Sequence, residues 1–276
     1  MRFASVTHQG RPFAVKIDGE QAVPLTDISE LGRSTPASLL AAPPLYDKVT
    51  FPVSELTYRP VVPNPSKVLC VGLNYLAHIQ ETQNKEHDYP VLFPKFASSL
   101  TGAFQDIPRP PESTDVDYEG ELAVVIGETV RRVSPENALA AVAGYTVAND
   151  ITMRDYQYKT AQYLQGKAWE SSTPLGPWLV TPDEVGDIRS LSLKTTVNGQ
   201  VVQDASTAQM IFDIPTLIST ISEFTSLQPG DVILTGTPSG VGFRRDPPLL
   251  LKDGDVVTVE IENVGRQDNR IVDEQV

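Results

Sequence analysis

Three carboxylates that could act together stand in one short segment of the chain. Asp117, Glu119 and Glu121 alternate along DYEGELAVVIG, residues 117–127. Alternate side chains of a β-strand point to the same face, so these acids would share one face. The apolar continuation predicts a buried strand, and buried carboxylates that lie together need a cation or a proton. The alternative is a solvated edge of an acidic protein.

A further acid, Asp150, ends the strand-like run YTVAND, residues 145–150. Site residues often stand where the chain leaves a sheet. Taken alone, the pair Asn149–Asp150 is more typical of a helix cap for the segment that follows. With Glu119 and Glu121, Asp150 would complete a three-carboxylate site, and oxygen donors favour Mg²⁺, Mn²⁺ or Ca²⁺ over zinc.

Two other groups could handle protons or anions. His78 and Glu81 are three positions apart in NYLAHIQET, so on a helix the carboxylate could orient and charge-stabilise the imidazole. The simpler explanation of such a pair is an exposed histidine on the surface. Lys167 lies in the sparsely charged QGKAWESSTPLGPW, where it would either reach an anionic substrate or snorkel along the surface.

The glycine-rich loop TGTPSGVG, residues 235–242, lacks the Gly-Lys-Ser/Thr ending of a phosphate loop. We expect a tight turn there, whose backbone and Thr237 hydroxyl approach a ligand closely. The sequence contains no G-x-S-x-G, H-E-x-x-H or C-x-x-C motif. Serine-hydrolase, zinc-peptidase and thioredoxin-like functions are therefore excluded.

The elements that must position these residues are mostly strands. Residues 1–60 predict two strands joined at Gln9–Gly10 and one short helix within 28–45. The proline-rich segment 57–67 predicts an extended connection, which divides the chain into a small β-rich domain, 1–62, and a larger domain, 63–276.

The larger domain alternates strands and turns with only brief helices. We expect strands at 67–75, 117–127, 145–150, 229–236 and 253–263, and a hairpin at 195–203 that turns at Asn198–Gly199. Helices are expected at 75–85, 135–144 and 214–224. The pattern favours an α+β fold that is mostly β, a barrel or sandwich.

Composition limits the partners. Lys and Arg number 22 against 35 Asp and Glu, a net charge of −13, which opposes binding to nucleic acid or anionic membranes. The single Cys70 excludes an intrachain disulfide. The sequence contains no secretory apolar region and no apolar run of about 20 residues, so we expect a soluble cytoplasmic protein.

A set of segments, taken in order, resembles the fumarylacetoacetate hydrolase family over about residues 67–265. The segments are VGLNYLAHIQE, FPK, DYEGELAVVIG, GYTVANDITMRDYQ, QGKAWESSTPLGPW, the VNG hairpin and PGDVILTGTPSGVG. The ordered set is specific, although no single segment is. The resemblance implies a mixed β-sandwich roll preceded by a small β-rich N-terminal domain, and a homodimer.

The resemblance also implies roles for matching positions. The ligands of a divalent metal, usually Mg²⁺, match Glu119, Glu121 and Asp150. A water-activating pair on a mobile lid matches His78 and Glu81, and the lysine near the metal matches Lys167. The positions that hold substrate oxygens match Arg154, Gln157 and Thr237. The lid, residues 78–89, is polar and expected to have few buried contacts.

The reaction implied first is metal-dependent hydrolysis of a C–C bond in acylpyruvate-type 1,3-diketo acids, in aromatic or sugar-acid catabolism. Related members act as oxaloacetate decarboxylases or 2-hydroxyhepta-2,4-diene-1,7-dioate isomerases, and a non-catalytic cation-binding protein is the alternative of another class. Phe96, Trp169 and Glu170 depart from the family pattern. We expect them near the pocket wall, so the resemblance does not determine which 2-oxo acid is the substrate.

Overall fold

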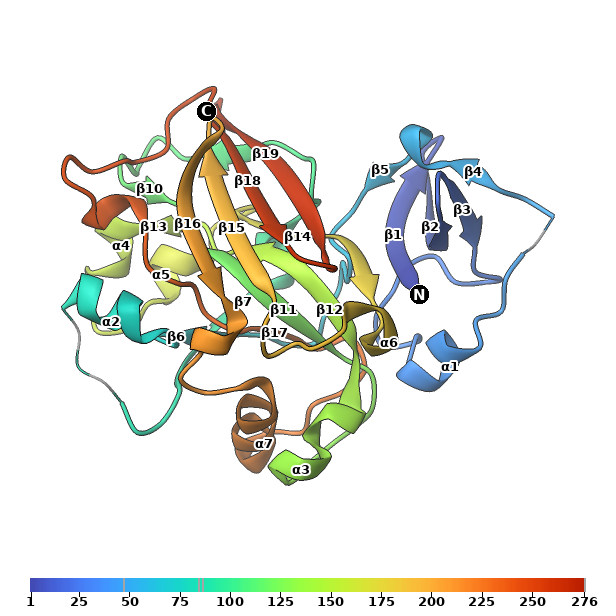
Figure 1. The fold of residues 1–276 in the computed structure, drawn as a ribbon. Coiled ribbons are helices and arrows are strands. Elements are labelled where there is room, and N and C mark those ends of the chain that lie inside the picture. Colours follow the sequence, from blue (N-terminus) through green and yellow to red (C-terminus); the bar gives the residue numbers. More distant parts are fainter. Residues whose placement is uncertain (47, 84, 86, 276) are drawn as a thin grey trace.

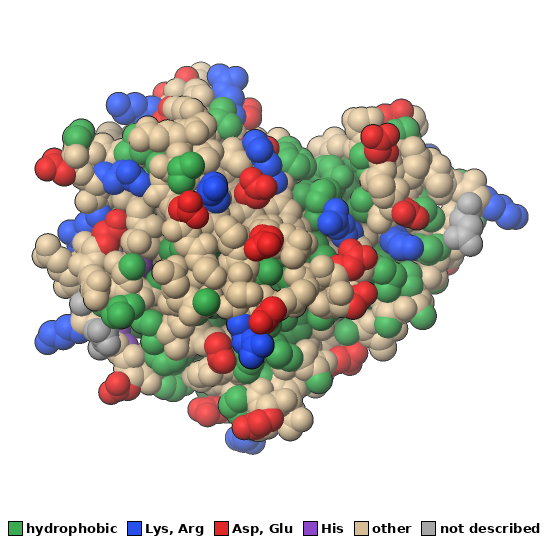
Figure 2. All heavy atoms as spheres, viewed as in Figure 1, with side chains coloured by type: hydrophobic (Ala, Val, Ile, Leu, Met, Phe, Trp, Pro, Cys, Tyr) green, Lys and Arg blue, Asp and Glu red, His purple; other side chains and the backbone are tan. Residues whose placement is uncertain are grey.

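The computed structural model describes residues 1–46, 48–83, 85 and 87–275, and Figure 1 shows their arrangement. Strands dominate and the helices are short, which confirms the predicted α+β, mostly-β class. None of the described helices is long and apolar enough to cross a membrane. Acidic and basic side chains are interspersed over the face drawn in Figure 2.

The largest sheet has twelve strands and runs through both parts of the chain. Across the sheet the strands are β4 (Phe51–Pro52), β3 (Gln21–Pro24), β2 (Arg11–Asp18), β1 (Arg2–His8), β14 (Thr173–Val180), β12 (Val142–Asn149), β11 (Gly120–Ile126), β17 (Val232–Leu234), β6 (Val68–Gly72) and β7 (Val91–Lys95). Two short strands pair off this path, β5 (Thr57–Tyr58) on β1 and β8 (Leu100–Thr101) on β14.

The N-terminal strands lie at one side of the molecule together with α1 (Ala37–Ala41) (Figure 1). β1 and β2 form a hairpin through Gln9–Gly10, as the sequence predicts. β1 also pairs with β14, Arg2 opposite Val180, so the N-terminal strands extend the sheet of the larger part. The division of the chain at residue 62 remains a prediction.

A second sheet of five strands covers one face of the first. Its order is β16 (Gln200–Ser206), β15 (Ser192–Val197), β18 (Val256–Ile261), β19 (Gly265–Asp273) and β9 (Ile107–Arg109). The predicted turn between β15 and β16 has positive φ at both central residues, Asn198 and Gly199, which suits an Asn-Gly hairpin. The core between the sheets packs Leu122 and Val147 against Leu193 and Val259.

Helix α7 (Ile214–Phe224) is the longest, and it begins where the Asp213 carboxylate accepts the Thr216 N–H. Its apolar face, including Leu217 and Ile221, packs into the core between the sheets. Two further short helices are α3 (Pro135–Ala138), which packs beside α7, and α6 (Pro182–Val185). The structure also has the 3₁₀ turns η1 (Val53–Glu55), η2 (Ala97–Ser99), η3 (Leu139–Ala141), η4 (Thr207–Gln209) and η5 (Gly242–Arg244).

The segments with predicted functional residues converge at one end of β11 and β12. These strands run antiparallel with Gly120 opposite Asn149, so the start of one lies beside the end of the other. The remaining elements at this end are β10 (Val116–Asp117) paired with β13 (Thr152–Met153), and the helices α2 (Leu76–Thr82), α4 (Arg154–Gln157) and α5 (Leu164–Lys167).

Candidate active site

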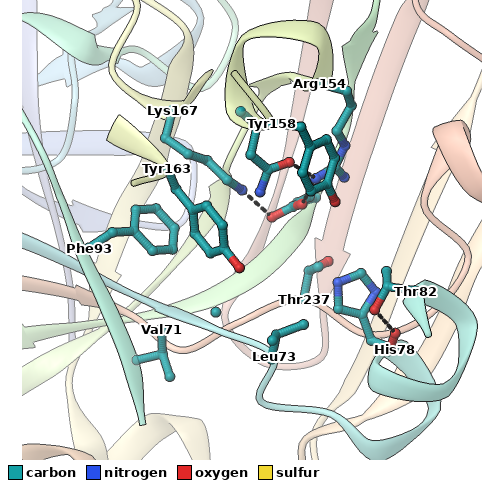
Figure 3. A pocket seen from close by; sticks show the side chains of 13 residues that line it. Val71, Leu73, His78, Thr82, Phe93, Arg154, Tyr158, Tyr163, Lys167 and Thr237 are labelled. Carbon is teal, nitrogen blue, oxygen red and sulfur yellow. Dashed lines mark hydrogen bonds and ion pairs between the residues drawn. The ribbon is translucent and has the colours of Figure 1, made fainter. Parts of the chain in front are cut away.

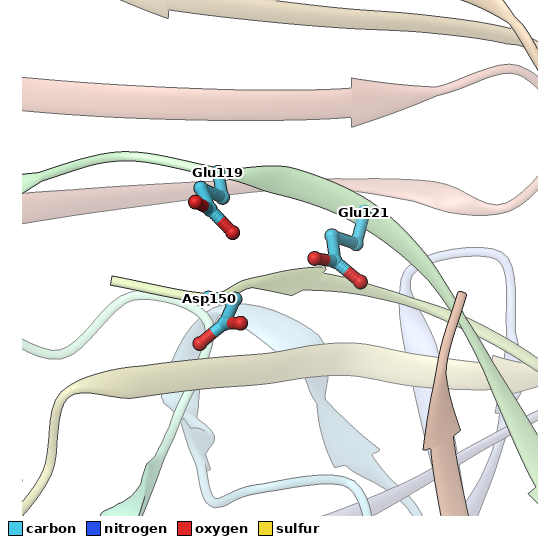
Figure 4. Close-up of side chains that lie close together, drawn as sticks. All are labelled: Glu119, Glu121 and Asp150. Atoms are coloured by element: carbon cyan, nitrogen blue, oxygen red, sulfur yellow. The ribbon is translucent and has the colours of Figure 1, made fainter. Parts of the chain in front are cut away.

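Glu119, Glu121 and Asp150 form a buried cluster at the point where β11 begins and β12 ends (Figure 4). One oxygen of each carboxylate lies within 4.8 Å of the others. The antiparallel pairing of the two strands brings these three positions together. Asp150 does not cap a helix: α4 begins after Met153, and the Asp150 carboxylate contacts two lysines. The helix-cap explanation of Asp150 is therefore wrong.

Asp117 lies apart from this cluster, although it is fully buried. The strand is interrupted between β10 and β11, so the alternation expected from Asp117 to Glu121 is broken. Asp117 instead accepts the Gly242 N–H at 2.7 Å and the Arg154 Nε–H at 2.9 Å. The prediction that all three acids share one face is wrong for Asp117.

Two buried lysines neutralise part of the cluster, because they contact Glu119 and Asp150. Lys167 Nζ donates to Glu119 Oε2 at 2.7 Å and to Asp150 Oδ2 at 2.9 Å. Lys95 Nζ contacts the other Asp150 oxygen, Oδ1, at 2.5 Å. Each oxygen of Asp150 therefore faces an ammonium group, and snorkelling of Lys167 to the surface is excluded because the residue is 2% exposed.

Sequence reasoning gave no role to Lys95. The sequence did contain a signal that Lys95 is buried, its position at the end of the apolar run VLFPK. A lysine that ends a buried strand has no short route to solvent. Such a residue needs a carboxylate partner. The identity of that partner depended on how distant strands pair, which the local sequence does not specify.

Arg154 links the cluster to Asp117. Its Nη1 lies 2.7 Å from Glu119 Oε1 and donates to Gln157 Oε1 at 2.9 Å, while Nη2 lies 2.8 Å from Asp117. The guanidinium also stacks over the Phe243 ring, with 4.3 Å to its centroid. Arg154 is therefore held on all sides by protein groups.

Without a further cation, the buried charges balance only while Glu121 keeps a proton. Burial, and then the charges of Asp150 and Glu119, raise the pKa of Glu121 well above its ordinary value. For Glu119 burial acts in the same direction, but Lys167 and Arg154 outweigh it and lower the pKa to about 2. Four buried carboxylates face three buried cations; they are Asp117, Glu119, Glu121 and Asp150 against Lys95, Lys167 and Arg154. The unmatched charge and the all-oxygen donor set fit a divalent cation.

Two glycines allow this arrangement. Gly236 has φ +99° and donates its N–H to Glu121 at 2.7 Å, and a side chain there would lie 2.8 Å from the Asn74 Cβ. Gly166 lets α5 pack directly on α4, since a Cβ would lie 2.5 Å from the backbone nitrogen of Gln157. The close contact of these helices places Lys167 beside the cluster.

His78 and Glu81 meet on α2, with His78 Nδ1 3.3 Å from Glu81 Oε2. Glu81 Oε1 also accepts the Gly240 N–H at 2.9 Å, which ties α2 to the loop after β17. His78 is 6% exposed, so the explanation of an exposed surface histidine is wrong.

The first part of the expected lid has more buried contacts than its polar sequence indicated. His78, Ile79 and Thr82 are buried, and Arg244 Nη2 donates to the Thr82 carbonyl at 3.0 Å. The expectation of few buried contacts is wrong for this part. The predicted segment also includes residues 84 and 86, which lie outside the described residues.

Five of the six predicted catalytic and substrate-binding side chains, all except Glu81, line one small cavity (Figure 3). His78, Glu119, Arg154, Gln157, Lys167 and Thr237 line it, and Val71, Leu73, Phe93, Tyr158 and Tyr163 complete its walls. The enclosed space is about 30 Å³, enough for one or two water molecules.

The three departures from the family pattern do not belong to this wall. The described residues that line the cavity do not include Phe96, Trp169 or Glu170. Trp169 packs edge-on against Tyr156, with 5.0 Å between centroids, and Phe96 is 52% exposed. None of the three therefore lines the cavity itself, although Phe96 and Trp169 follow Lys95 and Lys167 closely in the chain.

We expect Lys95→Met to lower the free energy of unfolding by about 3–5 kcal/mol in the absence of divalent cations, because it leaves one Asp150 oxygen buried without its cation. Mg²⁺ should raise the melting temperature of this variant more than that of the wild type. Thermal unfolding of both proteins, with and without Mg²⁺, checks this.

Lys67→Met is the matched control, since Lys67 Nζ contacts the buried carboxylate of Asp231 at 3.0 Å outside the cavity. This variant should also lose stability, but Mg²⁺ should raise its melting temperature only as much as that of the wild type. Equal Mg²⁺ stabilisation of all three proteins would contradict a cation site at the cluster.

Comparison with known proteins places the chain in a family. The family model "Fumarylacetoacetate (FAA) hydrolase C-terminal" matches residues 67–272. The chain is 43% identical to the mitochondrial oxaloacetate tautomerase of Rattus norvegicus, over 92% of this chain and 82% of that protein. It is 47% identical to a mitochondrial oxaloacetate tautomerase of Homo sapiens, over 80% of this chain and 71% of that one.

Solved structures agree with this match over the whole fold. The 2-hydroxyhepta-2,4-diene-1,7-dioate isomerase of Mycobacterium marinum superposes with a TM-score of 0.83 at 31% identity, over 100% of both chains. A fumarylacetoacetate hydrolase of Exiguobacterium antarcticum superposes with a TM-score of 0.84 at 33% identity, over 99% of this chain and 100% of that one. The chain belongs to the fumarylacetoacetate hydrolase family of enzymes.

Proposed function

We propose that the protein is a divalent-cation-dependent tautomerase that interconverts the keto and enol forms of oxaloacetate or a closely similar 2-oxo dicarboxylate. One observation carries the proposal: a buried histidine, His78, lines the same small cavity as Glu119 of the carboxylate cluster. The names of the rat and human relatives, at 43% and 47% identity, support this choice of reaction.

The residues present fit Mg²⁺, which Glu119, Glu121 and Asp150 would hold through carboxylate oxygens. When bound, the cation would chelate the 1-carboxylate and 2-oxo group and stabilise the negative charge that develops on the oxo oxygen. Lys167 and Arg154 add two positive charges at the same end of the cavity. Both charges are already paired with buried carboxylates, so the bound cation would supply the positive excess that favours a dianionic substrate.

His78 is the group proposed to move the proton. Tautomerisation transfers one proton between C3 and the 2-oxo oxygen and breaks no C–C bond. Glu81 engages Nδ1 of His78, which leaves Nε2 to take the C3 proton and return it to oxygen. A substrate that fills the small cavity would limit the entry of bulk water, which protects the enolic form from side reactions.

Hydrolysis of an acylpyruvate, the reaction that the sequence placed first, is the second candidate. The contact between His78 and Glu81 favours it, because the same pair could activate a water molecule. Hydrolysis also needs space for that water beside the substrate, whereas tautomerisation needs only the proton carrier and the charge-stabilising groups. Tautomerisation is therefore the first choice.

Three further functions are distinguished from these two by their product or by the residues that they need. Decarboxylation of oxaloacetate and isomerisation of a longer dioate use the same stabilisation of an enolate, so they share the cavity and differ in product. A non-catalytic cation-binding protein would not need His78 and Lys167 beside the cluster.

A homodimer and a cytoplasmic location remain part of the proposal, while the rat and human relatives are named as mitochondrial.

We expect His78→Asn to slow keto–enol interconversion of oxaloacetate by about 10²-fold or more, the usual effect of removing a general base. Mg²⁺ affinity should stay close to that of the wild type, because the proposed ligands lie on the sheet and not on α2. Loss of enol absorbance reports tautomerisation, and CO₂ release and acylpyruvate cleavage are measured on the same preparations.

His8→Asn is the matched control, because His8 Nε2 lies 3.1 Å from Glu55 in a second His–Glu pair outside the cavity. It should leave all rates unchanged. Wild-type enzyme that cleaves acylpyruvates into two acids without accelerating tautomerisation would establish the second candidate instead of the first. Equal loss of tautomerisation and decarboxylation in His78→Asn would show a general role in closing the cavity.

The raised pKa of Glu121 predicts how Mg²⁺ binding depends on pH. Without a cation, Glu121 keeps its proton to a higher pH than an exposed glutamate, mainly because it is buried. A metal ligand must be ionised, so Mg²⁺ must displace that proton. Affinity should therefore strengthen as pH rises toward the raised pKa and weaken as pH falls, with proton release measurable by calorimetry in two buffers of different ionisation enthalpy.

Glu121→Gln should abolish the proton release and weaken Mg²⁺ binding. Asp231→Asn, which changes a buried carboxylate outside the cavity, serves as the control and should bind Mg²⁺ like the wild type. Wild-type Mg²⁺ affinity together with wild-type turnover in Glu121→Gln would exclude Glu121 as a ligand.

A further inference from the structure

The hydroxyl group of Tyr163 enters the cavity, which Tyr163 lines together with Phe93 and Lys167. Figure 3 shows it pointing away from Phe93 into the space between Lys167 and Thr237. The Tyr163 ring packs edge-on against Phe93, with 5.9 Å between centroids and an interplanar angle of 76°. No residue in the part of the chain that the structure describes forms a hydrogen bond with this hydroxyl.

Three other polar side chains around the cavity, those of Lys167, Arg154 and Thr237, are already engaged. Lys167 donates to Glu119 and Asp150, and the Arg154 guanidinium contacts Asp117 and Glu119. Thr237 Oγ1 donates to the Gly120 carbonyl at 3.0 Å. Tyr163 therefore contributes a donor that a bound molecule can use without breaking a hydrogen bond within the protein.

This donor stands on an otherwise apolar wall. Burial raises the pKa of Tyr163, so at neutral pH the phenol keeps its proton and can donate it to a hydrogen bond. A carboxylate placed against this wall without a donor would lose its hydration without compensation. The residues of the wall are Val71, Gly72, Leu73, Phe93 and Tyr163, of which only tyrosine has a polar side-chain atom.

We propose that Tyr163 is a specificity-determining residue whose hydroxyl donates a hydrogen bond to the distal carboxylate of a four-carbon 2-oxo dicarboxylate. The inference rests on the proposed function, which places the 2-oxo acid end at the carboxylate cluster. That end would be held by the proposed cation. The distal carboxylate would meet the apolar wall, where Tyr163 supplies the hydrogen bond that Val71 and Phe93 cannot.

The test is Tyr163→Phe, which removes the hydroxyl and keeps the ring that packs on Phe93. We expect the KM for oxaloacetate to rise about 10- to 100-fold, the range for a lost hydrogen bond to a charged group. The kcat should change little, because the bond is made equally in the ground and transition states. The inhibition constant of oxalate, which lacks a distal carboxylate, should stay at the wild-type value.

Tyr58→Phe is the matched control: Tyr58 is also half-buried and packs edge-on against Phe104 outside the cavity. It should leave both constants unchanged. An unchanged KM for oxaloacetate in Tyr163→Phe would overturn the proposal. Equal weakening of oxaloacetate and oxalate would also overturn it, because the hydroxyl would then contact the 2-oxo acid end.

The failure of this inference and the failure of the proposed function give different experimental results. If the wild-type enzyme cleaves an acylpyruvate and does not tautomerise oxaloacetate, the proposed function is wrong. The same variants are then compared on that acylpyruvate, whose distal carbonyl oxygen is the acceptor, with oxalate again as the reference. A selective rise in the acylpyruvate KM would support the role of Tyr163, and an unchanged KM would overturn it.

Discussion

The compensation of charge around Asp150 and Glu119 is the interaction on which the rest of the structure depends. Moving several carboxylates out of water is unfavourable unless each finds a cation or a proton. Lys95, Lys167 and Arg154 supply three cations, and each comes from a different element: the end of β7, the end of α5 and the start of α4. The distant segments of the chain are held together at this point.

The fold places these groups by simple geometry. Antiparallel pairing of β11 and β12 brings Glu121 beside the end of β12, and Gly166 lets α5 approach α4 closely enough to position Lys167. When every carboxylate is ionised, the site is one positive charge short, and Glu121 is the carboxylate without a cationic partner among the described residues. A divalent cation would supply that charge and leave an excess that attracts an anionic substrate.

Much of this could be predicted from the sequence, because the signals were local. The alternation of Glu119 and Glu121, the spacing of His78 and Glu81, and the Asn198–Gly199 turn depend on the geometry of a single strand, helix or hairpin. The remaining features depend on long-range contacts. Examples are the pairing of Lys95 with Asp150 and the break that separates Asp117 from Glu119. The burial of α2 was also missed, since its polar sequence conceals contacts with the loop around Gly240.

The most direct test of the central claim is a crystal structure of the protein with Mn²⁺, located by its anomalous scattering. We predict one strong peak in contact with carboxylate oxygens of Glu119, Glu121 and Asp150, and no peak at this position in Glu121→Gln crystals treated in the same way. Crystals that contain Mn²⁺ elsewhere or not at all, with Lys95 and Lys167 still neutralising the cluster alone, would contradict the claim that these carboxylates form a divalent-cation site.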